Sequence, residues 1–129
     1  MSSWIDDELA RIEAADELYI ATARADGSLR NPVTIWVVRI GDELFVRAVR
    51  GTSGKWYGHA MASGKGRIEA GGVSKEVGLI KADDSRQGDI DAAYQSKYDR
   101  YGSRIVGSTL TAQAREATIK LVPLDDARH

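Results

Sequence analysis

The stretch that decides the fold is residues 29–49, which read LRNPVTIWVVRIGDELFVRAV. Its centre, residues 33–38, is rich in β-branched and aromatic side chains, which favour strands. Gly41-Asp42 predicts a tight turn, and after it the apolar side chains alternate between two faces, as they do in a strand. The stretch therefore predicts two antiparallel strands, at residues 29–40 and 43–49, joined by a short turn.

The same pattern extends outward in both directions. Residues 18–25 predict another strand, and Asp26-Gly27 joins it to the next one by a hairpin turn. Further strands are expected at residues 67–70, 75–81 and 117–122. Together these segments predict a mainly β (α+β) chain whose antiparallel strands close into a barrel.

Short helices are expected around the strands. Ile5, Leu9 and Ile12 fall at i, i+4 and i+7, so residues 4–15 predict a helix that lies over an opening of the barrel. A second helix is expected at residues 56–63, where Gly64 suits the C-cap. Two more helices are expected, one that carries Ile90, Tyr94 and Tyr98 and one at residues 110–116.

Length and composition exclude several classes of protein. The 129 residues fit one domain, which we expect to span residues 1–129. The net charge of −1 with scattered Lys and Arg argues against a nucleic-acid partner, and the absence of cysteine excludes disulfides and thiolate chemistry. No apolar run approaches the roughly 18 residues of a membrane span, and the first residues do not resemble a signal peptide. We therefore expect a cytoplasmic protein with no membrane partner.

The residues from Arg47 to Tyr57 carry the clearest chemical signal. They combine Arg47, Arg50 and Lys55 with small residues at positions 51–54. Small residues let backbone N–H groups approach an anion, and the start of the following helix adds positive charge. The stretch therefore indicates a phosphate cradle; the alternative is a solvated turn with ordinary surface charges. Its spacing does not match a Walker A loop.

Thr34 and Trp36 lie two residues apart on one strand and therefore point to the same face. If that face lines a cleft, Trp36 can stack on a planar ring and Thr34 can bond its edge; the alternative is a core Trp with a satisfied Thr. His59 is alone, so it is a poor metal ligand, and it is either a proton donor near the cleft or a helix residue without catalytic duty. No metal site and no catalytic residue is predicted.

The order of short motifs between residues 18 and 68 resembles a known family. The motifs are LYIATARADG at 18–27, PVTIW at 32–36, DELFVR at 42–47, SGKWY at 53–57 and GRI at 66–68. They resemble the pyridoxamine 5′-phosphate oxidase-like, FMN-binding split β-barrel superfamily. Trp56-Tyr57 after a Gly/Lys-rich loop is most similar to its deazaflavin-dependent nitroreductase branch. The chain also looks like an uncharacterised family of small bacterial proteins within that superfamily.

The resemblance implies a six-stranded antiparallel split β-barrel with short flanking helices. It also implies a homodimer that binds its cofactor, FMN or a deazaflavin, at the subunit interface. The residues it places around the cofactor are Thr34 and Trp36 near the ring, Arg47, Ser53 and Lys55 near the phosphate, and Arg50 and Trp56 as neighbours. The Arg-x-x-x-Leu-Lys phosphate signature of true pyridoxamine phosphate oxidases is absent, which argues against a pyridoxamine phosphate substrate.

Two classes of function are consistent with these features. The first is a flavin- or deazaflavin-binding oxidoreductase-like protein, in which the cofactor carries the hydride chemistry and the protein supplies binding and orientation. The second is a non-catalytic split-barrel domain that holds haem, a flavin or another ligand without turnover. A fold alone does not decide between them.

Overall fold

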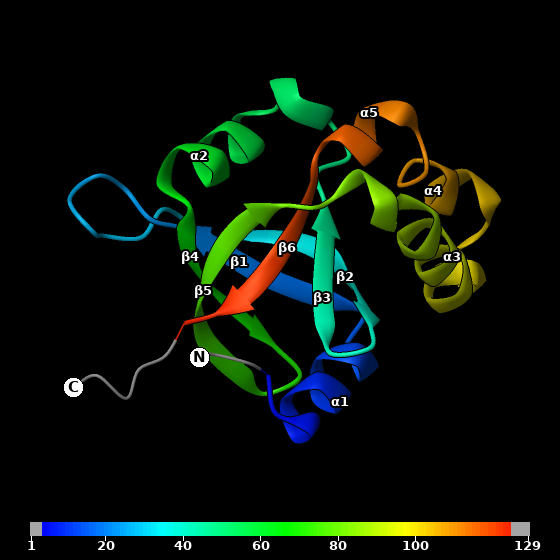
Figure 1. Cartoon of the computed structure of the whole chain (residues 1–129), viewed down its shortest axis with the longest axis horizontal. Coiled ribbons are helices and arrows are strands. Elements are labelled where there is room, and N and C mark those ends of the chain that lie inside the picture. Colours follow the sequence, from blue (N-terminus) through cyan, green and yellow to red (C-terminus); the bar gives the residue numbers. More distant parts are fainter. Residues whose placement is uncertain (1–3, 125–129) are drawn as a thin grey trace.

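The computed structural model describes residues 4–124, and in it six strands close into a barrel in the order β1-β2-β3-β6-β5-β4 (Figure 1). The strands are β1 (Glu17–Thr22), β2 (Val33–Ile40), β3 (Glu43–Arg47), β4 (Lys65–Ala70), β5 (Val73–Lys81) and β6 (Thr118–Pro123). All neighbouring pairs are antiparallel. The predicted mainly β, six-stranded antiparallel barrel is therefore confirmed. A single domain over residues 1–129 reaches beyond the described residues and stays a prediction.

The barrel closes because β6, the last strand, lies between β3 and β5. Val46 of β3 pairs with Ile119 of β6, and Leu121 of β6 lies opposite Leu44 and Leu79 on its two sides. On the other side of the barrel, β1 joins β2 to β4. Closure pairs every strand on both sides, so no strand edge is left open.

Alternating apolar side chains fill the inside of the barrel, as the period of two predicts. The buried residues there include Leu18, Ile20, Val37, Leu44, Val46, Ile68, Val77, Ile119 and Leu121. Helix α1 (Asp6–Ala14) closes one opening and adds Leu9 and Ile12, both fully buried, to this core. A Cβ at Gly71 would lie 2.2 Å from the carbonyl oxygen of Arg11, so α1 packs directly onto the β4–β5 turn.

The remaining helices lie at the other opening and along one flank (Figure 1). They are α2 (Lys55–Ser63), α3 (Gln87–Tyr98), α4 (Ser103–Gly107) and α5 (Ala112–Glu116). Helix α2 ends at Ser63, and Gly64, whose φ is 66°, forms the expected left-handed C-cap. Helix α3 buries the predicted stripe of Ile90, Tyr94 and Tyr98 in a second apolar cluster with Val38 and Phe45. Helix α3 therefore covers the part of the outer face of β2 and β3 around Val38 and Phe45.

Several strand boundaries differ from the predicted ones, most of all those on either side of the β1–β2 loop. The strand expected at residues 18–25 ends at Thr22, and the strand expected at 29–40 begins at Val33. The connecting loop is closed by its own bonds, since the Arg24 N–H donates to the Ser28 carbonyl oxygen at 2.7 Å. Pro32 has no N–H to donate to a ladder, which explains why β2 starts after it. None of the helices described between residues 4 and 124 is long and apolar enough to cross a membrane.

Candidate functional site

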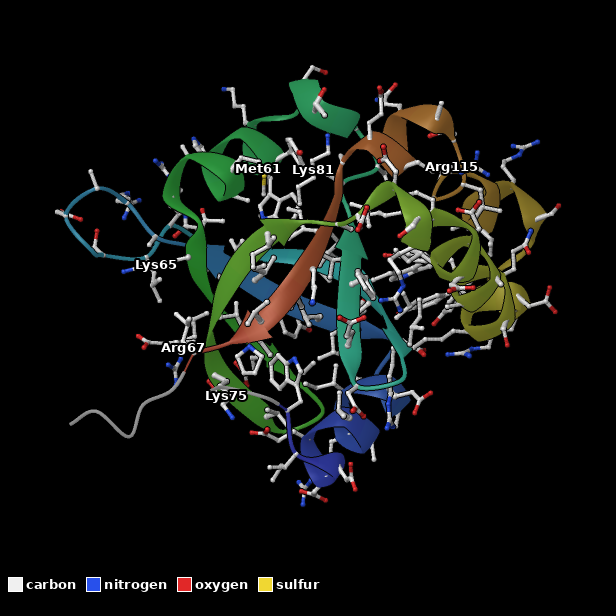
Figure 2. All side chains as sticks on the ribbon, viewed as in Figure 1. Met61, Lys65, Arg67, Lys75, Lys81 and Arg115 are labelled. Carbon is white, nitrogen blue, oxygen red and sulfur yellow. The ribbon has the colours of Figure 1, made fainter. Side chains whose placement is uncertain are left out.

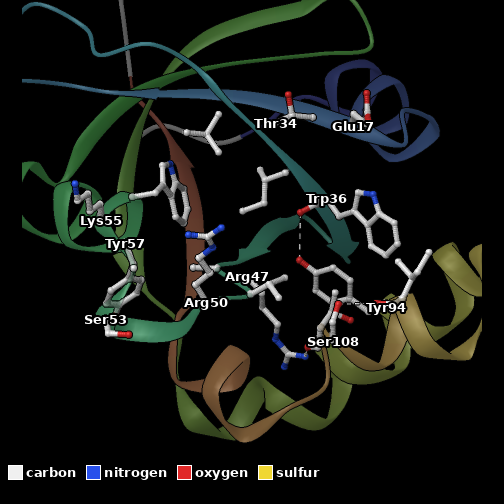
Figure 3. A pocket seen from close by; sticks show the side chains of 18 residues that line it. Glu17, Thr34, Trp36, Arg47, Arg50, Ser53, Lys55, Tyr57, Tyr94 and Ser108 are labelled. Carbon is white, nitrogen blue, oxygen red and sulfur yellow. Dashed lines mark hydrogen bonds between the residues drawn. The ribbon is translucent and has the colours of Figure 1, made fainter.

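A pocket of about 930 Å³ lies between the outer face of β2, the loop after β3, the start of α2 and the segment around α4 (Figure 3). Its volume falls near the upper end of the range for small-molecule sites, about 300–1,000 Å³. The structure brings all the residues of the predicted site to its wall: Thr34, Trp36, Arg47, Arg50, Ser53, Lys55 and Trp56. His59, in contrast, is not among the lining residues.

One end of the pocket carries unpaired positive charge. Within residues 4–124, the side chains of Arg50 and Lys55 form no ion pair and no hydrogen bond. Figure 3 shows the Arg50 guanidinium directed toward the middle of the pocket and Lys55 at its edge. Two cations without protein partners are available to an anionic ligand, and surrounding charges do not already neutralise them.

The start of α2 adds backbone donors at the same end. Gly54 is the N-cap, and the first helical hydrogen bond runs from the Gly58 N–H to the Gly54 carbonyl oxygen at 3.2 Å. The N–H groups of residues 55–57 therefore have no intrahelical acceptor. The loop before them is held in place at Gly51, where φ is 79° and a Cβ would lie 2.2 Å from Gln113 Cγ of α5.

Arg47, unlike Arg50 and Lys55, donates its guanidinium hydrogen bonds to protein acceptors. Its Nε donates to Thr118 Oγ1 at 3.0 Å, and its Nη1 donates to Asp91 Oδ1 at 2.6 Å and to the Thr109 carbonyl oxygen at 2.7 Å. Its Nη2 donates to Oε1 and the carbonyl oxygen of Gln87. These bonds use all five guanidinium N–H groups. The arrangement therefore does not support the phosphate role expected for Arg47, which instead forms part of the pocket wall.

Strand alternation explains where Arg47 points. Val46 faces the barrel interior, so Arg47 faces outward, under α3, and its side chain is fully buried there. Asp91 of α3 joins it to Arg115 of α5, whose Nη2 lies 2.5 Å from Asp91 Oδ2. This network, buried at Arg47 and exposed at Arg115, links α3 and α5 to the barrel beside the pocket.

The ring of Trp36 forms the opposite side of the pocket. It stacks on Tyr98 with 3.9 Å between ring centroids and planes 1° apart, and Tyr101 lies 5.2 Å away. Tyr98 and Tyr101 are 6.1 Å apart, much less than the sum of those distances, so they cannot cover opposite faces of the indole. Tyr101 lies near its edge instead. The second face of Trp36 is therefore free of these tyrosines.

Trp56 has an unsatisfied polar atom. Its Nε1 is buried and has no hydrogen-bond partner among the described residues. A buried donor without an acceptor costs about 1–3 kcal/mol. The side chain as a whole is half-buried and lines the pocket.

Hydrogen bonds from Tyr94 and Lys97 of α3 reach the backbone of β2 at and next to Trp36. The Tyr94 hydroxyl donates to the Trp36 carbonyl oxygen at 3.2 Å, and burial raises the pKa of Tyr94 and of Tyr98 above the ordinary tyrosine value. Lys97 Nζ donates to the Val37 carbonyl oxygen at 2.8 Å and lies 5.1 Å from the Tyr98 ring centroid. Burial lowers the pKa of Lys97 to about 8.

These pKa shifts predict how stability depends on pH. Between about pH 8, the folded pKa of Lys97, and its ordinary value of about 10.4, the unfolded chain holds a proton that the folded protein has released. Unfolding then takes up a proton, so the free energy of unfolding should rise with pH in this interval. Above about pH 10 it should fall, since unfolded tyrosines ionise while the buried Tyr94 and Tyr98 phenols stay protonated.

Urea unfolding of wild type and Lys97→Met across this pH range measures the contribution of Lys97. The variant should lack a rise of about 1–2 kcal/mol, a value reduced for solvent screening. Lys65→Met, at an exposed lysine, should retain the rise. A wild-type profile as flat as that of Lys97→Met would contradict the assignment.

Several lining residues were not expected from the sequence. Glu17, Tyr57, Tyr94, Ile105 and Ser108 also contribute to the wall. The register could have indicated Glu17, because it lies directly opposite Trp36 across the β1–β2 pair and so shares its face. Tyr94 and Ser108 come from segments far along the chain, for which the sequence carries no comparable signal. Among residues 4–124, no three His, Cys, Asp or Glu side chains gather in a way that could hold a metal ion.

Comparison with known proteins gives a family and a fold. A family model described as "Uncharacterized protein conserved in bacteria (DUF2255)" matches residues 8–121. A search of curated proteins found no match to this sequence.

Solved structures resemble the chain over most of its length. A candidate pyridoxamine 5′-phosphate oxidase from Listeria innocua has a TM-score of 0.61 at 13% identity, with 93% of each chain covered. The haem storage protein HutZ from Vibrio cholerae has a TM-score of 0.61 at 13% identity, covering 90% of this chain and 87% of that one. An F420 reductase has a TM-score of 0.52 at 19% identity, covering 90% and 92%. These likenesses confirm the predicted split-barrel fold.

Proposed function

The chain belongs to the DUF2255 family, and we propose that it is an oxidoreductase-like protein that binds a phosphorylated flavin or deazaflavin at a homodimer interface. The observation that carries the proposal is the polarity of the pocket. Arg50, Lys55 and the free amides of α2 lie at one end, and Thr34 and Trp36 lie at the other (Figure 3). A ligand with an anionic end and a planar end fits this arrangement.

The phosphate end would be held by charge-assisted hydrogen bonds. Arg50 and Lys55 would donate to the phosphate oxygens, together with the Ser53 hydroxyl and the N–H groups at the start of α2. The Trp56 indole N–H lacks an acceptor, and an oxygen of the same ligand could satisfy it. Arg47 would act from behind, by holding α3 and α5 in place rather than by touching the ligand.

The ring end would be held mainly by stacking. Tyr98 stacks on one face of Trp36, and the second face, which neither Tyr98 nor Tyr101 covers, would stack on a planar ring. Thr34 lies two residues before Trp36 on β2 and can bond the edge of that ring. A flavin or deazaflavin bound here would supply hydride transfer, while the protein binds and orients it.

The homodimer rests on apolar side chains exposed around the pocket. Val33, Val49 and Ile105 line it with exposed fractions of 38%, 45% and 51%, and Tyr19 is exposed on the neighbouring strand. Helix α3 already covers the outer faces of Val38 and Phe45, so it accounts for only part of the apolar outer surface of β2. A second subunit that covers the remaining surface would also enclose a ligand in the pocket.

The likeness to HutZ favours haem as a second candidate ligand. Haem iron in proteins is held by His, Cys, Met or Tyr. The pocket wall, as far as residues 4–124 form it, contains no His, Cys or Met, but it does contain Tyr57 and Tyr94, and the Tyr94 hydroxyl already donates to the Trp36 carbonyl oxygen. Tyr57 would therefore hold the iron of a haem. The protein would then be a non-catalytic haem carrier and not an oxidoreductase.

Sedimentation velocity with optical detection tests ligand and assembly together. With FMN added at low micromolar protein, absorbance near about 450 nm should move with a species of twice the 14.1 kDa chain mass. The same run with haem should show little co-sedimenting Soret absorbance. A monomer at every concentration would contradict the interfacial site, and co-sedimenting haem without FMN would favour the second candidate.

A further inference from the structure

Glu17 places a free carboxylate at the ring end of the pocket. In the β1–β2 register it lies opposite Trp36, and Tyr19 lies opposite Thr34, so these four side chains share the outer face of the barrel. Figure 3 shows Glu17 beside Thr34, on the side of the pocket away from Lys55 and Ser53.

The carboxylate has no protein partner. Glu17 is exposed and forms no ion pair or side-chain hydrogen bond within residues 4–124, unlike the neighbouring Asp16, which pairs with Arg100 and Tyr101. It is also the one carboxylate among the described residues that line the pocket. An ionised carboxylate only accepts hydrogen bonds, so a ligand group next to it must donate.

We infer that Glu17 selects a planar ligand whose ring edge donates an N–H, and that it bonds this edge while Arg50 and Lys55 hold the phosphate. The inference rests on the proposed function and narrows it to ligands with donors at the ring and acceptors at the tail. The pyrimidine edge of a flavin carries such a donor at N3, and the same edge is present in a deazaflavin. A ring whose edge offers only acceptors would meet the Glu17 carboxylate with repulsion instead.

The test compares FMN with 3-methyl-FMN, in which a methyl group replaces the N3 hydrogen and the phosphate is unchanged. Wild type should bind FMN about tenfold more tightly, as expected for one charge-assisted bond that is partly screened by solvent. Glu17→Ala should bind both ligands with nearly equal affinity, mainly because its affinity for FMN falls. Glu17→Gln keeps a carbonyl acceptor without the charge. Its preference for FMN over 3-methyl-FMN should be intermediate between those of wild type and Glu17→Ala.

Glu69→Ala is the matched control. Glu69 is an exposed carboxylate on β4, paired with Tyr19 across the β1–β4 ladder, and it does not line the pocket. This variant should keep the wild-type preference. Equal affinity of wild type for FMN and 3-methyl-FMN, with FMN still bound, would overturn the inference and leave the proposed function standing. Failure of wild type to bind either FMN or the corresponding deazaflavin 5′-phosphate would overturn both.

Discussion

Asp91→Ala is expected to destabilise the protein by about 3 kcal/mol, the lower part of the range for removing one partner of a buried ion pair. The guanidinium of Arg47 is fully buried, and Asp91 is its only charged partner among the described residues. Without Asp91 it would keep neutral acceptors but lose its compensating charge. Because the same network holds α3 and α5, affinity for FMN should fall as well.

Urea unfolding at neutral pH measures this effect against two comparisons. Asp89→Ala removes an exposed aspartate from the same helix. Within residues 4–124 the one ion pair of Asp89 is a long contact of 4.0 Å with Arg86, so the variant should change stability by less than about 0.5 kcal/mol. Arg47→Met/Asp91→Leu removes both buried charges and should recover most of the lost stability. If Asp91→Ala were as stable as Asp89→Ala, Arg47 would not depend on Asp91 in the way described.

Arg50→Ala/Lys55→Ala is expected to weaken FMN binding by about a hundredfold or more. Each charge-assisted bond to phosphate contributes about 1.5–3 kcal/mol, and about 1.4 kcal/mol corresponds to a factor of ten. Neither side chain has a protein partner within residues 4–124, so their removal should leave the stability of the fold nearly unchanged. Isothermal titration calorimetry beside a thermal melt separates the two quantities.

Lys65→Ala/Arg67→Ala makes the same change in net charge away from the pocket. Both residues are exposed on β4, on the side of the barrel away from α3 to α5 (Figure 2). This control should lower FMN affinity only slightly, and the small loss should vanish at high salt. Equal losses of FMN affinity in the two double variants would mean that the overall charge of the protein, and not a specific phosphate site, attracts the phosphate.

The sequence predicts the barrel well because strands obey a local rule. Alternation along residues 43–49 shows which side chains face the interior, and Gly41 and Gly27 mark turns that the structure contains with positive φ. The same alternation shows that the Arg47 side chain points away from the barrel interior. It cannot show what lies outside, because Asp91 is 44 residues and Thr118 is 71 residues further along the chain.

The candidate site shows the same difference between local features, which the sequence predicts, and long-range contacts, which it does not. Arg50 and Ser53 lie in one short loop and Lys55 is the first residue of α2, so their proximity follows from the chain itself. The stacking of Tyr98 on Trp36 depends on how α3 docks, and no local pattern encodes it. Helix α4 was not predicted either, since five residues with little apolar periodicity give no helical signal. Site residues that lie close together in the sequence could therefore be predicted, whereas contacts between distant segments could not.

The central claim is that the pocket recognises a phosphate and a planar ring at the same time. Titration of wild type with FMN and with riboflavin, which carries the same ring without the phosphate, tests it most directly. FMN should bind at least about a hundredfold more tightly at low salt, and this preference should shrink as salt rises. Equal affinities for the two ligands would contradict the claim, because Arg50, Lys55 and the start of α2 would then form an ordinary turn.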